Sequence, residues 1–258
     1  MKVHYETAGE SNGDNGDVVV LSNSIGSNLH MWDPQVTPLV DAGFRVVRYD
    51  TRGHGRSPVP AGPYSIADLG GDVVELLDTL GVDSAHFVGL SLGGMTGAWL
   101  GSHAPERIRS LTLTFTSVRP GNVDMWTGRA KQVRAEGMAA IAEGSIGRWF
   151  TRDWIDANPE QAGELRQMTA TTPAEGYASC CEAIAGLDLT GDLATITAPT
   201  LVISGADDAA LPPDHGARIA EGVPGARFEV LDHAAHLGSW EQAERFTGLL
   251  LDHLEGAR

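Results

Sequence analysis

The sequence lacks the features that would carry the chain into a membrane or out of the cell. None of its 258 residues belong to an uninterrupted apolar run of about 18, the length that crosses a bilayer. Met1 to Ala8 reads as strand, with Lys2 and Glu6 between apolar residues, and has neither the basic start nor the apolar stretch of a secretion signal. We therefore expect a cytoplasmic protein.

Cysteine and positive charge are both scarce. Only Cys180 and Cys181 are present, and adjacent cysteines pair only with strained geometry, so a disulfide framework is excluded. The 18 Lys and Arg residues face 34 Asp and Glu, a net charge of −16 that would repel nucleic acid and anionic membranes. A site for an anionic small molecule would have to supply local positive charge.

Apolar runs of strand length alternate with segments of helical period, which is typical of a mostly parallel sheet with helices on both faces. The runs are short, rich in β-branched and aromatic residues, and bounded by Gly, Pro, Asp or Ser. They are Val18 to Leu21, Phe44 to Tyr49, Ala85 to Gly89, Leu111 to Phe115, Thr200 to Ser204 and Phe228 to Leu231. The predicted fold class is α/β.

Helical spacing marks the segments between the strands. One helix is predicted over 66–80, with Ser65 capping its start and Gly81 its end. A second runs from Leu92 to about His103, and a final one from Ser239 toward Leu254.

The stretch 120–193 breaks this alternation. It carries helical patterns around 129–143 and 159–168 with no strand between them. We interpret it as a helical cap inserted into a core formed by 1–119 and 194–258, a single compact unit; ordinary crossover helices are the alternative.

The motif Gly89-Leu90-Ser91-Leu92-Gly93-Gly94 lies between a predicted strand and a predicted helix. A nucleophile elbow places serine in a strained strand-to-helix turn, and the flanking glycines leave room for it. A plain glycine turn is the alternative. The strand before, the helix after, and an Asp and a His later in the chain favour a nucleophile at Ser91.

Acid and base candidates follow the last two strands. Asp207 and Asp208 come after the strand at 200–204, and by position either could orient a catalytic histidine. His233 and His236 share the next loop, and we prefer His236 because it is nearest to the final helix.

Serine is a weak nucleophile at neutral pH, so His236 would take its proton during attack and return one to the leaving group. The carboxylate would fix the imidazole tautomer. Attack on the carbonyl gives a negatively charged oxygen, the oxyanion, which needs two peptide N–H groups as hydrogen-bond donors. We expect these to be the N–H groups of Leu92 and of Ile25, although the loop around Ile25 also fits a plain Gly-Ser turn.

Several motifs occur together in one protein family. They are Asp50-Thr51-Arg52-Gly53-His54-Gly55-Arg56-Ser57, the elbow at Ser91, and Gly205-Ala206-Asp207-Asp208. With these motifs the chain resembles the α/β-hydrolases over essentially its whole length. In that family the catalytic acid is the last residue of the third of these motifs. The resemblance therefore selects Asp208.

Within that fold the chain resembles the 3-oxoadipate enol-lactonases of aromatic catabolism. Ser22-Asn23-Ser24-Ile25-Gly26, followed by His30-Met31-Trp32-Asp33, stands where most relatives carry a His-Gly pair. The predicted cap is also similar to that family's cap, at Trp126, Arg129, 136–138, 148–151 and 175–184.

The resemblance implies hydrolysis of 3-oxoadipate enol-lactone to 3-oxoadipate, in protocatechuate and catechol catabolism, through an acyl-enzyme and with no metal or organic cofactor. Rival interpretations are a broader carboxylesterase or lactonase, a carbon–carbon bond hydrolase, and a non-catalytic ligand-binding receptor of the same fold. Ser91 opposes haloalkane dehalogenation, which uses an aspartate nucleophile in this fold.

Three cap residues are candidates for substrate binding. Arg129 would pair with the substrate carboxylate, and Trp126 and Trp149 would line the pocket. The alternatives are a solvated arginine and two tryptophans of the cap core. The chain departs from the family at Gly238-Ser239-Trp240 and at Ala209, where a proline is common. A Trp240 facing the pocket would alter the size of substrate accepted.

Overall fold

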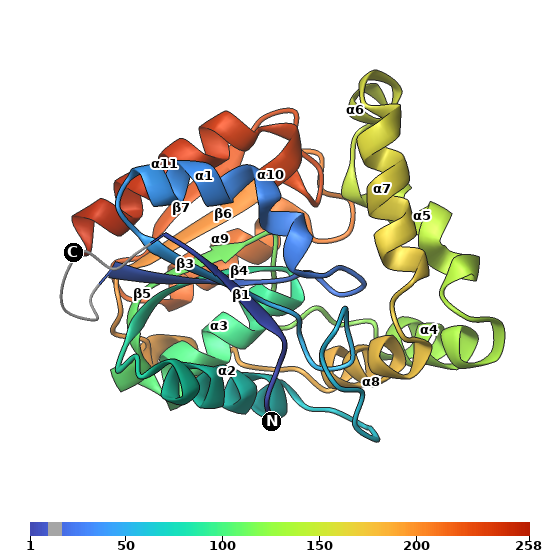
Figure 1. Ribbon diagram of the computed structural model, residues 1–258, viewed down its shortest axis with the longest axis horizontal. Helices are drawn as coiled ribbons and strands as arrows, with labels where there is room; N and C mark the ends of the chain where they lie inside the picture. The colour runs from blue at the N-terminus through green and yellow to red at the C-terminus, as the bar shows by residue number, and fades with distance from the viewer. Residues whose placement is uncertain (10–16) are drawn as a thin grey trace.

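The computed structural model describes residues 1–9 and 17–258, whose seven strands form one sheet in the order β1-β3-β2-β4-β5-β6-β7 (Figure 1). Only β1 runs antiparallel to its neighbour; the remaining pairs are parallel. The strands are β1 Tyr5–Ala8, β2 Val18–Ser22, β3 Arg45–Tyr49, β4 Ala85–Leu90, β5 Ile108–Thr114, β6 Thr200–Gly205 and β7 Arg227–Leu231.

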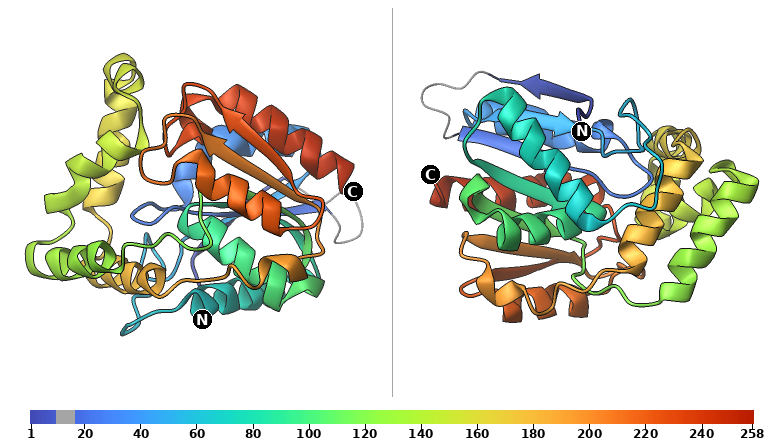
Figure 2. Two further views of the ribbon diagram at one scale, coloured as in Figure 1. Left: turned by 180° about the vertical axis from the view of Figure 1, so that it is seen from behind. Right: turned by 90° about the horizontal axis from the view of Figure 1, so that it is seen from below.

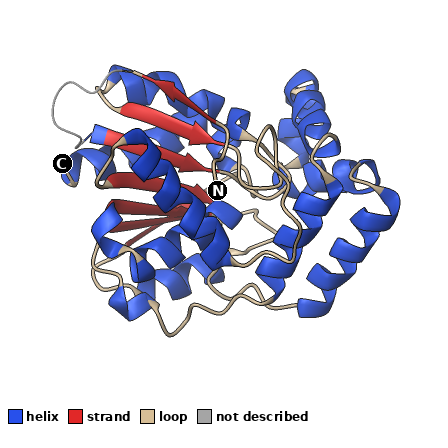
Figure 3. Cartoon of the chain, turned by 60° about the horizontal axis from the view of Figure 1, so that its bottom comes forward, coloured by secondary structure: helices blue, strands red, loops and turns tan. Residues whose placement is uncertain are grey.

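Helices cover both faces of the sheet because its strands are apolar on both sides. In β2, Val18 and Val20 pack into one core cluster while Val19 and Leu21 pack into another. Figures 2 and 3 show the sheet between these two helical layers. The first cluster lies under α2 Ile66–Leu80, α3 Leu92–His103 and α9 Pro213–Gly222, and the second under α1 Asp33–Asp41 and α11 Ala243–Gly256.

The predicted mostly parallel α/β sheet is confirmed, with small shifts at the strand ends. β5 begins at Ile108, before the predicted Leu111, and Phe44 precedes β3. Both predicted ends of α2 are confirmed. The Ser65 hydroxyl accepts from the Asp68 N–H at 3.1 Å, and Gly81 ends the helix in the left-handed conformation at φ 65°.

Two predicted helices are wrong as continuous elements. Gly137, at φ 78°, divides 129–143 into α4 Val123–Glu136 and α5 Ala139–Trp149, because a positive φ cannot continue a right-handed helix. The final helix is divided at Gln242 into α10 Gly238–Glu241 and α11. Gln242 leaves the helical conformation and donates from its side chain to the carbonyl of His233, at 3.1 Å.

Five α-helices lie between β5 and β6 in the described chain, and we call residues 123–185 the helical segment. They are α4, α5, α6 Arg152–Ala157, α7 Pro159–Ala170 and α8 Ala174–Ala185. The segment lies beyond one end of the sheet, clear of its two faces (Figure 1). No helix within 1–9 and 17–258 is long and apolar enough to cross a membrane.

Specific contacts attach the helical segment to the rest of the chain. The Leu237 N–H donates to the Trp149 carbonyl at 2.8 Å. The Glu241 carboxylate accepts from the N–H and the hydroxyl of Thr151, both at 2.7 Å. A Cβ on Gly176 of α8 would lie 2.0 Å from the Gly53 carbonyl oxygen, so backbone packs directly on backbone there. These contacts fix the segment over the ends of the strands.

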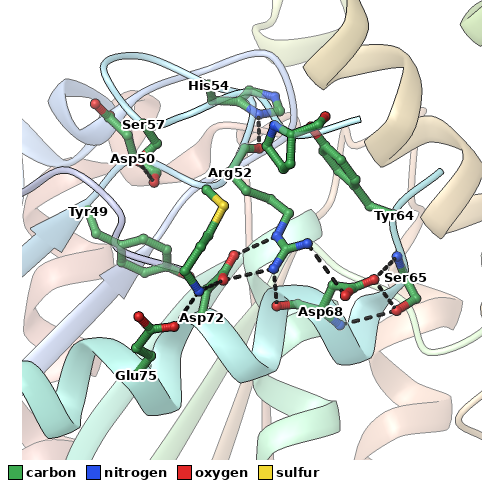
Figure 4. A network of polar contacts seen from close by, with 12 residues as sticks. Tyr49, Asp50, Arg52, His54, Ser57, Tyr64, Ser65, Asp68, Asp72 and Glu75 are labelled. Atoms are coloured by element: carbon green, nitrogen blue, oxygen red, sulfur yellow. Dashed lines mark hydrogen bonds and ion pairs between the residues drawn. The ribbon is translucent and has the colours of Figure 1, made fainter. Parts of the chain in front are cut away.

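A polar network anchors the loop after β3 to helix α2 (Figure 4). The Arg52 guanidinium donates to both carboxylate oxygens of Asp72, at 2.6 and 2.8 Å, and to the Asp68 carbonyl at 3.0 Å. Asp72 is buried, and a bidentate arginine compensates the cost of burying its charge. The loop 50–57 is therefore held rigidly beneath the ends of the central strands.

Candidate active site

Ser91 stands at the junction of β4 and α3 with φ 57° and ψ −112°, a conformation that non-glycine residues rarely adopt. The positions beside it have no room for a side chain, so they must be glycine. A Cβ atom on Gly89 would lie 2.2 Å from the carbonyl oxygen of Gly93, and a Cβ atom on Gly93 would lie 2.2 Å from the carbonyl oxygen of Ser22. The Ser91 N–H donates to the Thr114 carbonyl at 2.9 Å. The turn thus presents the serine in a fixed position.

His236 and Asp208 are brought together. The Nδ1 atom of His236 lies 2.8 Å from one Asp208 carboxylate oxygen, and both side chains are buried. The other oxygen accepts from the N–H groups of Ala210 and Leu211, at 2.9 and 3.0 Å. With Nδ1 committed to the carboxylate, Nε2 of His236 is left for proton transfer.

The rival residues of the same two loops lie elsewhere. Asp207 and His233 are both exposed. The Asp207 N–H donates to the Ala234 carbonyl at 3.0 Å, and His233 adopts φ 54° in its turn. The geometry therefore pairs Asp208 with His236.

A cavity of about 310 Å³ contains Ser91 and His236 in its lining. Of the residues predicted for substrate contact or the oxyanion, Ile25, Trp126, Arg129 and Trp149 also line it. Leu92 and Asp208 are not among the lining residues; Asp208 makes its contact with His236 at Nδ1. The size suits a small ligand.

The two peptide N–H groups predicted for the oxyanion belong to Leu92, directly after Ser91, and to Ile25, in the loop after β2. Leu92 is the first residue of α3, and the first N–H groups of a helix have no acceptor within it. Ile25 follows Ser24 in a turn that the Ser27 N–H closes on the Ser24 carbonyl at 3.3 Å. The partial positive charge of the helix start favours an anion beside Leu92.

Arg148 joins Arg129 in the cavity lining, although the sequence did not single it out as a binding residue. Its guanidinium donates to the Ser145 hydroxyl at 3.1 Å, and that of Arg129 lies 5.0 Å from the Trp126 ring centroid. Neither arginine forms an ion pair within the part of the chain that the structure describes. In a chain of net charge −16, this cavity keeps unpaired positive charge.

Burial and the neighbouring charge act on Arg148 in the same direction. Burial lowers the pKa of its guanidinium, and the positive charge of Arg129 lowers it further. The Arg148 guanidinium nevertheless remains charged at neutral pH, as arginine does in proteins. An anionic ligand would relieve this repulsion.

Trp240 does not line the cavity. Its indole N–H donates to the Met31 carbonyl at 2.7 Å, and the ring packs against the core cluster under α1 and α11.

Within 1–9 and 17–258, no group of three or more His, Cys, Asp or Glu side chains is arranged to hold a metal ion.

Comparison with known proteins decides the family. The family model for the alpha/beta hydrolase fold matches residues 17–243. The chain belongs to the α/β-hydrolase fold family. This hydrolase is 41% identical to 3-oxoadipate enol-lactonase 2 of Acinetobacter baylyi, over 95% of its own length and 90% of that protein.

A solved enol-lactonase from Burkholderia xenovorans LB400 superimposes on this α/β-hydrolase with a TM-score of 0.95 and 44% identity, covering 98% of this chain and 96% of the other. The hydrolase is also 32% identical to RutD of Stutzerimonas stutzeri, and this match covers 98% of this chain and 96% of the other. RutD itself is only proposed to hydrolyse carbamates. The predicted resemblance to enol-lactonases is confirmed.

Replacing each aspartate of the motif tests which one supports the histidine. Asp208→Asn removes the carboxylate that contacts His236, so we expect kcat for ester hydrolysis to fall by about 10³- to 10⁴-fold. Asp207→Asn is the matched control and should stay within about twofold of wild type, because Asp207 is exposed. Steady-state kinetics with p-nitrophenyl acetate would measure both. The reverse order would assign the acid to position 207.

Proposed function

We propose that this α/β-hydrolase converts 3-oxoadipate enol-lactone to 3-oxoadipate through a triad of Ser91, His236 and Asp208. One observation carries the proposal: Ser91 and His236 line a small cavity whose lining also includes two arginines with no carboxylate partner in the described chain. The similarity to two enol-lactonases over nearly the whole chain supports the same substrate.

The first half-reaction opens the lactone. The Ser91 hydroxyl attacks the lactone carbonyl while Nε2 of His236 takes its proton, which gives a tetrahedral intermediate. The ring C–O bond then breaks, His236 returns the proton to the departing oxygen, and the resulting enol ketonises. An enol leaves more readily than an ordinary alcohol, so a modest acid catalyst is sufficient.

The second half-reaction frees the serine. His236 takes a proton from water, the hydroxide attacks the ester carbonyl formed on Ser91, and the serine oxygen leaves with the proton that the histidine returns. Asp208 holds the imidazole in the required tautomer and stabilises the imidazolium in both halves. The products are the free enzyme and a dicarboxylate, and no cofactor enters the balance.

The oxyanion of each tetrahedral intermediate would be bound by the N–H groups of Ile25 and Leu92. Such donors stabilise the charge that develops in the transition state more than the neutral carbonyl of the substrate. Leu92 adds the favourable field of the start of α3.

The substrate carboxylate would be held by Arg148 and Arg129. A guanidinium presents a fork that matches the two oxygens of a carboxylate, and the interaction is strong where solvent is restricted. Trp126 and Trp149 line the same cavity and would contact the carbon skeleton of the lactone.

The helical segment would act as the cap of a core formed by 1–119 and 194–258, with the boundaries of the cap at 120–193. It contributes both arginines and both tryptophans of the cavity, so it would select the substrate while the core supplies the triad. We place this enzyme in the cytoplasm and in aromatic catabolism, because both suit the proposed reaction.

The reaction is tested by following the loss of enol-lactone absorbance with purified wild-type protein, alongside p-nitrophenyl acetate. We expect fast loss of the enol-lactone and a slower but readily measurable cleavage of the ester. Ser91→Ala should lower both rates at least about a thousandfold with an unchanged circular-dichroism spectrum. Rapid ester cleavage with an inert lactone would discard the substrate, and full activity of Ser91→Ala would discard the nucleophile.

The carboxylate partners are tested by Arg129→Ala and Arg148→Ala. Each loses a charged hydrogen bond, so kcat/KM for the anionic lactone should fall about 10- to 100-fold while that for neutral p-nitrophenyl acetate changes little. Arg166→Ala is the control, since Arg166 is exposed and pairs with Glu143 at 3.0 Å. Equal losses on the anionic and the neutral substrate would argue against carboxylate recognition.

A further inference from the structure

The peptide that joins Ser24 to Ile25 carries the N–H group assigned to the oxyanion. Its carbonyl, on Ser24, accepts from the Ser27 hydroxyl at 2.7 Å. A trans peptide is planar, and its N–H points opposite to its C=O. A side chain that holds the Ser24 carbonyl therefore also fixes the direction of the Ile25 N–H.

The next peptide along the loop is held by a histidine from another part of the chain. The Gly26 N–H donates to Nε2 of His54 at 3.0 Å, and Nδ1 of His54 lies 3.1 Å from the Arg52 carbonyl. These two contacts assign the proton to Nδ1 and leave Nε2 as the acceptor. Burial lowers the pKa of His54 to about 4, so the ring is neutral at neutral pH.

His54 is itself rigidly supported. It lies in the loop 50–57, which Arg52 anchors to Asp72 of helix α2 (Figure 4). A second contact joins the same two loops, because the Asp50 carboxylate accepts from the Leu29 N–H at 2.9 Å. The loop bearing Ile25 is thus tied to a fixed point of the core.

We propose that Ser27 and His54 are positioning residues that hold the Ile25 N–H at the site of the oxyanion. The proposal rests on the proposed serine mechanism and extends it to two buried side chains that are not among the residues lining the cavity. Each bond contributes little to the stability of the fold, whereas a displacement of about 1 Å at a reacting centre can cost about a hundredfold in rate.

Two replacements of His54 separate its two hydrogen bonds. A glutamine side-chain oxygen stands as many bonds from Cα as Nε2 does, so His54→Gln keeps an acceptor for the Gly26 N–H. An asparagine amide stands where Nδ1 does, so His54→Asn keeps the donor to Arg52 and loses that acceptor. We expect His54→Asn to lower kcat at least about tenfold with KM within about twofold, and His54→Gln to recover most of that loss.

Ser27→Ala provides an independent test if His54→Asn does not fold. It removes the hydroxyl that holds the Ser24 carbonyl, so kcat should again fall about tenfold with little change in KM. Ser102→Ala is the matched control, because that hydroxyl donates to the Ala98 carbonyl at 3.0 Å, within α3 and outside the cavity lining. Thermal unfolding of every variant separates loss of fold from loss of rate.

Both series would be measured on the enol-lactone and on p-nitrophenyl acetate. Hydrolysis of either needs the oxyanion, so a wild type active only on the ester would refute the proposed lactone substrate and still test the positioning residues. Parallel kcat losses on the substrate used, with folded variants, would support the proposal. Equal kcat for His54→Asn and His54→Gln, or for Ser27→Ala and Ser102→Ala, would overturn it.

Discussion

The turn at Ser91 is the constraint on which the rest of the site depends. A positive φ at a serine persists only where the surroundings enforce it, and here β4, α3 and the glycine contacts with the end of β2 all do so. Because parallel strands end at the same edge of the sheet, the loops carrying Ile25, Asp208 and His236 reach the same point. The strained backbone is confined to Ser91, and the strands and helix around it hold it in that conformation.

The cavity holds positive charge in a chain that is acidic as a whole. The excess of acidic residues would repel an anion over most of the surface, yet Arg129 and Arg148 stay unpaired in the cavity. Both come from the helical segment, which Glu241 and Leu237 tie to the loop carrying His236. The segment that bears both arginines is therefore joined by hydrogen bonds directly to the chain that follows His236.

The sequence was most informative where local rules decide the structure. Strand runs, the capped helix at 66–80 and the strand-to-helix turn at Ser91 follow from periodicity and glycine placement, and the structure differs from them only by a few residues at the strand ends. The sequence does not identify Arg148 as a residue of the cavity. Which face of α5 borders the cavity depends on how α4 and α5 pack together, and the spacing of residues in the sequence does not show that packing. The sequence shows His54 only as part of the motif 50–57, because its contact with Gly26 joins loops that are distant in the sequence.

We propose that an anionic lactone binds with its carbonyl at the oxyanion donors and its carboxylate at the arginines. A crystal structure of the Ser91→Ala variant with bound enol-lactone tests it most directly. We expect the carbonyl oxygen within hydrogen-bonding distance of the Ile25 and Leu92 N–H groups, with the carboxylate on Arg148 or Arg129. A lactone bound in the opposite orientation, or outside this cavity, would contradict it.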